Sequence, residues 1–190
     1  MAPGTAAPEG SLDSRRSGRI FVDPTRPALD VPSAVLNQVF EEALKACGET
    51  GEECCGLLVG DDEAPFREAH PCANDMNRHH RRDPFNHPRD ARHAFHMREA
   101  DYQRVVREAE ARGLRVTAVY HSHVNADAYF SELDQDFASQ PLFPFPDAAH
   151  VVVSVTGEPG GPAHVVGAGA FRYLPDELRF EGRVVRPAVP

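Results

Sequence analysis

A strand, a polar turn and the start of a helix follow one another in the stretch LRVTAVYHSHVNADAYFSELD, residues 114–134. Leu114 to Tyr120 have high β-propensity, which predicts a strand that leads into two histidines, His121 and His123. Successive side chains of a strand point to opposite faces, so residues two positions apart share a face. We therefore expect both imidazoles together at the carboxyl end of the strand, where open α/β sheets tend to build binding sites.

Two imidazoles on one face can converge on a metal ion, because zinc binds histidine nitrogens at about 2 Å. Asp134 is the best candidate for a third ligand, since Ser131 has the character of a helix N-cap and Asp134 follows in the first turn. The same spacing is also that of an ordinary capping-box variant, which needs no metal. Three protein ligands would leave a fourth position for water, as in catalytic zinc sites. The competing nearby carboxylates are Asp127, Glu132 and Asp136.

Hydrophobic periodicity predicts the remaining elements. Apolar residues spaced three and four apart predict a helix that opens near Ser33 and ends at Gly48 or Gly51, and another over 98–112. A third helix is expected over 131–140. Strands are expected over 19–22, 53–60, 66–72, 150–155, 163–173 and 178–185. Strands and helices alternate, with antiparallel hairpins near the end, so we expect an α/β fold with a mixed sheet and helices on both faces.

One domain is expected over residues 19–188, after a leader at residues 1–18. The leader is rich in Ala, Pro, Gly and Ser and lacks an apolar core, so it is expected to be disordered and not an export signal. A cytoplasmic location is therefore expected. Residues 74–97 fit neither period and are rich in His and Arg, which predicts a long loop with a functional role. Two hypotheses for this loop are an insertion that borders the cleft and a second metal site at His93 and His96.

Charge and composition exclude several classes of function. The formal net charge is −9 and no basic stripe is present, so nucleic acid and anionic membranes are not expected as partners. No apolar run approaches the roughly 20 residues that a membrane-spanning helix needs. The cysteines form no C-x-x-C pair and are expected in the core, with a nucleophilic Cys54 or Cys55 as the minor alternative.

The order His-x-His, seven residues, Ser, two residues, Asp resembles the signature of the JAMM (MPN-plus) metallopeptidases. His121, His123, Ser131 and Asp134 fill that signature without a gap. The family also carries an upstream Glu in a Glu-x-Cys-Gly context, and the run ECCGLLVG from Glu53 to Gly60 is similar to it. The resemblance extends over roughly residues 31–185. It implies a three-layer α/β/α sandwich with a mixed sheet, the cytidine-deaminase-like JAMM fold.

The resemblance also implies roles for these residues. The ligands of one catalytic Zn²⁺ would be His121, His123 and Asp134. Glu53 would activate water as general base, and Ser131 would donate a hydrogen bond to the developing oxyanion. The implied partner is a ubiquitin-like or sulfur-carrier protein, cut at the peptide or isopeptide bond after its C-terminal Gly-Gly. The alternative is a non-catalytic MPN scaffold, although such domains lack one or more of these ligands.

Overall fold

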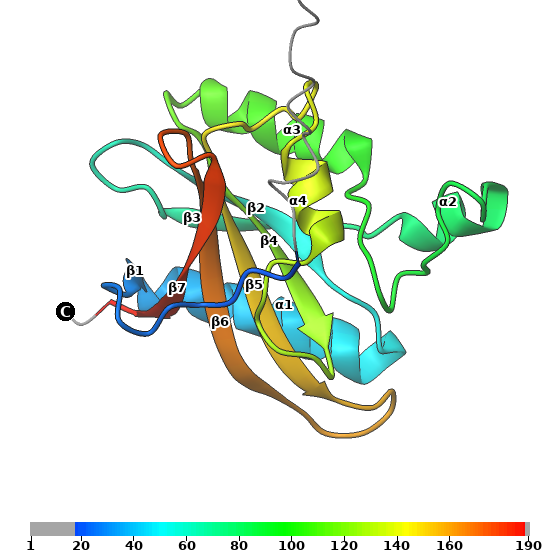
Figure 1. The fold of residues 1–190 in the computed structure, drawn as a ribbon. Helices are drawn as coiled ribbons and strands as arrows, with labels where there is room; N and C mark the ends of the chain where they lie inside the picture. The colour runs from blue at the N-terminus through cyan, green and yellow to red at the C-terminus, as the bar shows by residue number, and fades with distance from the viewer. Residues whose placement is uncertain (1–17, 189–190) are drawn as a thin grey trace, which may run out of the picture.

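The computed structural model describes residues 18–188, so the predicted leader, apart from Gly18, lies outside the described residues. This part of the chain forms one sheet and four helices (Figure 1). The strands are β1 (Leu29–Val31), β2 (Cys55–Gly60), β3 (Glu68–Cys72), β4 (Arg115–Val124), β5 (Ala149–Gly157), β6 (Ala163–Leu174) and β7 (Arg179–Pro187). The helices are α1 (Ser33–Thr50), α2 (Met76–Arg82), α3 (Glu99–Glu110) and α4 (Glu132–Ala138).

The sheet is mixed, as the sequence predicts. Its strand order is β1-β7-β6-β5-β4-β2-β3. β4 pairs parallel with β5, and β1 pairs parallel with β7, whereas the other neighbours are antiparallel. β4 therefore lies inside the sheet, with hydrogen-bonded partners along both of its edges.

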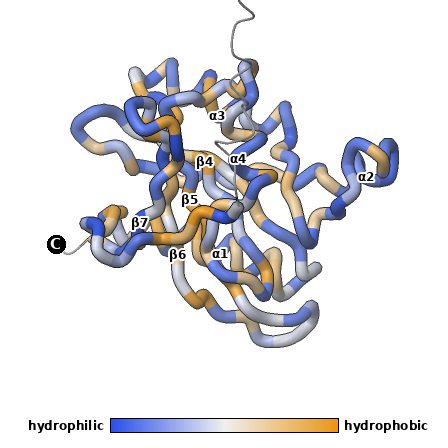
Figure 2. The backbone as a smooth tube through the Cα atoms, in the orientation of Figure 1, coloured by the Kyte–Doolittle hydropathy of each residue, from blue (hydrophilic) through white to orange (hydrophobic). Residues whose placement is uncertain are grey.

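Helices cover both faces of the sheet, which gives the expected α/β fold in three layers. α1 packs on one face, where Leu36 joins Tyr120 of β4 in a hydrophobic cluster. On the other face, Val105 of α3 and Phe137 of α4 pack with Val119 of β4. Hydrophobic residues concentrate on the central strands, whereas α2 and the loops beside it are largely hydrophilic (Figure 2). No described helix is both long and apolar enough to span a membrane.

The glycine of the Glu-Cys-Cys-Gly run is explained by close packing between strands. Gly56 of β2 is paired with Tyr120 of β4 and with Pro71 of β3. A Cβ atom on Gly56 would collide with the Tyr120 ring and with the carbonyl oxygen of His70. Glycine at this position therefore allows the Tyr120 side chain to lie directly against the β2 backbone.

Several local predictions need correction. Residues 19–22 do not form a strand, since Ile20 makes only an isolated bridge with Phe130. The sequence does not predict β1, because three residues are too few for a periodic pattern. Residues 74–97 contain α2, so the prediction of a loop throughout is wrong there. Only Met76 is buried among the seven residues of α2, and such a helix has no apolar stripe to predict it.

Candidate metal centre

Three potential ligand side chains meet at the carboxyl end of β4. The Nε2 atoms of His121 and His123 are 3.2 Å apart. The Asp134 carboxylate places Oδ1 3.4 Å from the first of these nitrogens and Oδ2 3.7 Å from the second. All three residues are buried. Among the described residues, this is the one group of three or more His, Cys, Asp or Glu side chains whose ligand atoms come this close together.

The spacing of these atoms fits a tetrahedral ion. Zinc bonds of about 2.0–2.1 Å place the ligand atoms of a tetrahedron about 3.3–3.4 Å apart. The two imidazole nitrogens are 3.2 Å apart, close to that value. The carboxylate approaches them with different oxygens, Oδ1 toward His121 and Oδ2 toward His123, and one ligand atom from each of the three residues lies within 4.8 Å of the other two. Two imidazoles and a carboxylate are also ligand types that zinc accepts in proteins. The donor set therefore matches zinc in ligand type, and its atoms lie close enough together to surround one ion.

β4 sets the direction of both imidazoles. Its side chains alternate between the two faces, so His121 and His123 lie on the same face as Val119, toward α3 and α4. The Nδ1 atom of His123 donates to the carbonyl oxygen of Asp127 at 3.0 Å. Because a carbonyl can only accept, this bond places the proton on Nδ1 and leaves the Nε2 lone pair for a cation.

Asp134 is held by the capping box that opens α4. The Ser131 amide donates to Asp134 Oδ2 at 2.9 Å, and the Ser131 hydroxyl donates to the same oxygen at 2.6 Å. In return the Asp134 amide donates to Ser131 Oγ at 3.2 Å. The capping and ligand interpretations are therefore compatible, since the box orients the carboxylate toward the histidines. The ligand group includes none of the competing carboxylates, Asp127, Glu132 and Asp136.

Burial and neighbouring charges set the protonation states of the ligands. Burial lowers the pKa of His121 and so favours the neutral imidazole. Burial alone would raise the pKa of Asp134, but His121, His123 and Ser131 outweigh it and hold that pKa well below its ordinary value. Burial lowers the pKa of His123 as well, but Asp134 and Glu53 outweigh it, so the net shift is upward. A charged carboxylate beside a neutral imidazole is the state that metal binding requires.

Glu53 lies beside this group. The sequence predicts a strand that begins at Glu53, but the structure places Glu53 before the strand. β2 begins at Cys55, and the β2–β4 register pairs Cys55 with His121. Continued by two residues, that register places Glu53 opposite His123. The Glu53 side chain is 7% exposed. Burial raises its pKa to about 8, with His123 opposing the shift and Asp134 adding to it. A carboxyl group that titrates near neutral pH is suited to general acid–base chemistry.

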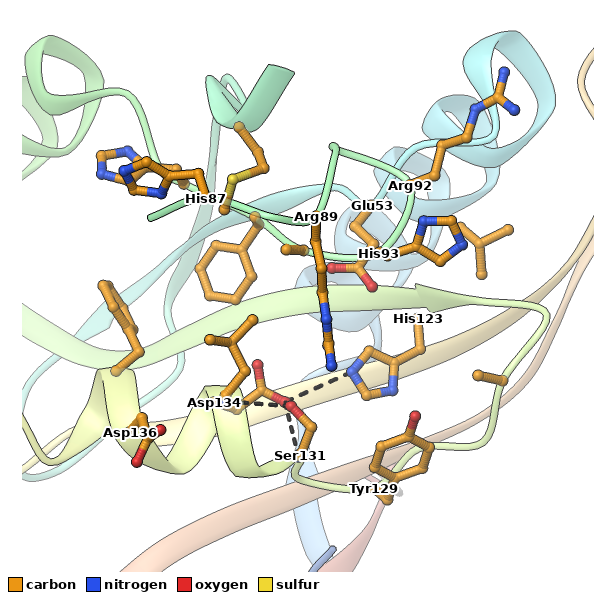
Figure 3. A pocket seen from close by; sticks show the side chains of 18 of the residues that line it. Glu53, His87, Arg89, Arg92, His93, His123, Tyr129, Ser131, Asp134 and Asp136 are labelled. Atoms are coloured by element: carbon orange, nitrogen blue, oxygen red, sulfur yellow. Dashed lines mark hydrogen bonds and ion pairs between the residues drawn. The ribbon is translucent and has the colours of Figure 1, made fainter. Parts of the chain in front are cut away.

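A cleft of about 700 Å³ opens onto these groups (Figure 3). One wall is formed by α4 and the turn before it, which contribute Tyr129, Ser131 and Asp136. The opposite wall comes from residues 74–97, and Arg89 points from there into the cleft. The segment therefore borders the cleft, as the first of the two hypotheses requires.

The contacts of His93 and His96 do not support the other hypothesis for this segment, a second metal site at these two residues. The His93 ring is largely exposed, and its Nδ1 lies 3.0 Å from the Asp90 carboxylate. The His96 ring instead stacks on His79, with ring centroids 3.8 Å apart. The two side chains therefore take part in separate interactions, and neither belongs to a group of three ligands among the described residues.

The cysteines behave as core residues, as the sequence predicts. All four are free and buried. Burial raises the pKa of Cys54 to about 12, and burial also raises the pKa of Cys55 well above its ordinary value. Neither lines the cleft. A thiolate nucleophile at Cys54 or Cys55 is therefore excluded on grounds of both protonation and access.

Three residues of the site have no signal in the sequence. The Phe95 ring stacks on His121 with centroids 4.6 Å apart, and the Tyr129 ring lies 4.7 Å from that of His123. Asn74 donates a hydrogen bond to the backbone carbonyl of Glu53. The contacts of Phe95 and Asn74 join segments that are distant in the chain, and no local pattern encodes them.

Comparisons with known proteins agree with this fold. The solution structure of a protein from Desulfitobacterium hafniense is similar, with 16% identity and a TM-score of 0.52, over 85% of this chain and 93% of the other. A Salinibacter ruber protein gives 23% identity and the same TM-score and coverage. At these identities the likeness shows the fold alone.

Among curated proteins there is no significant match. The family model for prokaryotic homologs of the JAB domain matches residues 33–166, which include Glu53, both histidines, Ser131 and Asp134. JAB domains comprise metallopeptidases and also members without catalytic activity. Because this match spans most of the chain, the protein belongs to the JAB (MPN) domain family.

Proposed function

We propose that this protein is a zinc-dependent metallopeptidase. It hydrolyses the peptide or isopeptide bond that follows the Gly-Gly tail of a ubiquitin-like or sulfur-carrier protein in the cytoplasm. The observation that carries the proposal is the buried group of His121, His123 and Asp134, whose ligand atoms lie within 4.8 Å of one another. Glu53 and Ser131 line the same cleft as His123 and Asp134.

The ligands for zinc are His121, His123 and Asp134. When bound, zinc supplies a Lewis acid and a water molecule whose pKa is lowered toward neutrality. Glu53 would accept a proton from the attacking water and would give it to the departing amine, first as general base and then as general acid. Its burial beside His123 supports this role, because burial raises its pKa from the ordinary carboxylate range toward neutrality. A bound cation beside it would favour the charged carboxylate that the first step needs.

Ser131 has two tasks in this proposal. Its hydroxyl donates to Asp134 Oδ2, and its Oγ accepts from the Asp134 amide. The hydrogen bond from the Asp134 backbone amide to Ser131 Oγ can persist while the Ser131 hydroxyl rotates. Its proton then turns from Asp134 toward the substrate oxygen that gains negative charge in the reaction. Donors of this kind contribute about 3–4 kcal/mol to transition-state stabilisation.

The substrate class rests on the family and on the form of the cleft. JAB-domain proteins include isopeptidases. The cleft is bounded by bulky side chains such as Phe95, Tyr129 and Phe137, so a chain with side chains next to the cut bond would compete with them for space. A Gly-Gly tail has no such side chains and can approach the reacting groups most closely.

Metal analysis followed by cleavage tests this proposal. The purified protein is analysed for bound metals and then incubated with ubiquitin-like proteins that carry an extension after Gly-Gly, either linear or linked through a lysine. We expect one zinc per chain and a product that ends in Gly-Gly by intact mass. A chelator should abolish cleavage, and added zinc should restore it.

Two negative outcomes have different meanings. A protein that takes up no zinc would refute the metal centre itself. A protein that holds zinc and cleaves neither the linear nor the lysine-linked substrates would instead be a non-catalytic scaffold, which is the alternative for this family.

A further inference from the structure

The 74–97 segment holds the backbone on both sides of Glu53. The Glu53 amide donates to the carbonyl oxygen of Ala91 at 2.8 Å. Its carbonyl oxygen accepts from Asn74 Nδ2 at 3.0 Å. Glu53 precedes the first paired residue of β2, Cys55, in both sheet ladders. The position of the Glu53 carboxylate therefore depends on this segment as well as on the sheet.

Asn74 is the centre of the attachment. Its Nδ2 donates to the carbonyls of Glu53 and Ala94, at 3.0 and 3.1 Å. Its Oδ1 accepts from the amides of Met76 and His96, both at 3.0 Å. A side-chain amide has two donor hydrogens and two acceptor lone pairs, so Asn74 uses its whole capacity here. One side chain thus joins the start of α2, the end of the segment and Glu53.

Asn77 fixes the second attachment point. Its Oδ1 accepts from the Ala91 amide at 3.0 Å, and its Nδ2 donates to Glu52 Oε1 at 2.7 Å. Ala91, whose carbonyl receives the Glu53 amide, is therefore held in place itself. A small buried cluster supports this turn, formed by Met76, Ala91 and Ala94.

The metal ligands make no hydrogen bond to Asn74 or Asn77. His123 is held by the Asp127 carbonyl, and Asp134 by Ser131. We propose that Asn74 is the positioning residue of the general base, and that it promotes turnover through Glu53 without taking part in zinc binding. This inference rests on the proposed role of Glu53. Misplacing a reacting group by about 1 Å can lower a rate about 100-fold, so loss of the attachment should be visible in turnover.

Steady-state kinetics give the first test. Asn74→Ala and the isosteric Asn74→Asp, which loses both donated bonds, should lower kcat about 10- to 100-fold. KM and zinc content should stay unchanged. Asn37→Ala, on the exposed face of α1, is the matched control and should behave as wild type. Unchanged kcat in both Asn74 variants would overturn the proposal.

A double-mutant cycle shows whether Asn74 acts through Glu53. In a Glu53→Gln background, Asn74→Ala should cause no further loss of kcat, because the group that it positions is already absent. If the two losses multiply instead, Asn74 acts by another route and the proposal is wrong.

Amide hydrogen exchange gives a readout that needs no activity. Asn74→Ala or Asn74→Asp should speed exchange of the Glu53 amide by about tenfold or more, while the amides of β5, which makes no contact with the segment through its ladder, keep their wild-type rates. Asn77→Ala, a milder variant, should give a smaller change in the same direction. If wild type cleaves nothing, the proposed function fails, whereas an unaltered Glu53 amide in all three variants refutes the attachment itself.

Discussion

The two halves of the site are held by different kinds of structure. His121, His123 and Asp134 are placed by regular elements, a strand with partners on both edges and a helix that starts with a capping box. Glu53 is placed by an irregular segment: Asn74 donates to its carbonyl, and its amide donates to the carbonyl of Ala91. Backbone ladders fix the direction of a side chain locally. A segment held by side-chain amides can change its sequence and shift its contacts without altering the sheet.

This difference separates metal binding from turnover. Changes at the β4–α4 half should remove the metal and, with it, all activity. Changes at the Glu53 half should leave the metal bound and alter only the rate. The predictions below test this separation, from the largest effect to the smallest.

His123→Ala should have the largest effect. It leaves two ligands, so the protein should lose stoichiometric zinc, all detectable cleavage and the increase in Tm that zinc gives to the native state. Zinc content and thermal unfolding with and without metal measure this directly. The matched control is His164→Ala at an exposed position of β6, which should bind zinc normally. Full zinc content in His123→Ala would show that the ligand set is wrong.

Glu53→Gln should separate the two properties. The substitution preserves shape and removes the proton acceptor, so kcat should fall about 10²–10⁴-fold while zinc content stays at the wild-type value. Because burial raises the pKa of Glu53 to about 8, the metal-free protein carries it mostly protonated at pH 7, and the neutral Gln should cost little stability. The control is Glu49→Gln, at an exposed position of α1. Wild-type turnover in Glu53→Gln would show that Glu53 is not the general base.

Ser131→Ala should have an intermediate effect on both halves. Loss of the N-cap should cost about 1 kcal/mol of unfolding free energy. Loss of the hydrogen bonds to Asp134 should weaken zinc binding about 10- to 100-fold, as is usual for groups that orient a ligand. At saturating zinc, kcat should still fall about 10²–10³-fold if the hydroxyl serves the oxyanion. Ser131→Thr keeps the hydroxyl and serves as the control. A normal kcat in Ser131→Ala at saturating zinc would show that Ser131 acts only as the helix cap.

The metal half of the site could be predicted from the sequence because its determinants are local. His121 and His123 share a face through the two-residue period of a strand, and Asp134 follows its cap Ser131 by three residues. The α/β class and the two long helices were accessible for the same reason, since α1 and α3 each carry an apolar face. Each of these two relations spans at most three residues, and the structure brings the three side chains together.

The support of Glu53 could not be predicted, since it is made at long range. Asn74 and Glu53 are 21 residues apart in the sequence, and a single polar residue carries no pattern that predicts a contact with the Glu53 carbonyl. α2 could not be predicted for a related reason. A helix that buries only Met76 has no periodic apolar face in its sequence. β1 is also missed, since its parallel pairing with β7 joins the two ends of the described chain. The sequence therefore indicates that 74–97 is unusual, but not how it is attached.

Mild acid should affect the two halves differently. Burial, together with the neighbouring histidines, lowers the pKa of His79 and His96, while Asp75 opposes the shift. Both pKa values are thus below the unfolded value of about 6.5, so the stabilisation is complete above that pH and is lost as the pH falls below it. Protonation would place two cations in one ring stack. After correction for intrinsic rates, amides of 74–97 should therefore exchange a few-fold faster at about pH 5.5 than at about pH 7.5, with β5 unaffected.

The effect should be the smallest of the set, because both rings are partly exposed and water screens their charges. His79→Gln provides the control, since it removes the ring that stacks on His96 and should weaken the pH dependence of exchange in 74–97, with His87 left as the remaining neighbour of His96. The same exchange rate at both pH values in wild type would mean that the stack does not hold the segment. In that case the Asn74 and Asn77 amides, the backbone bond from Glu53 to Ala91 and the small buried cluster hold it against Glu53 without help from the stack.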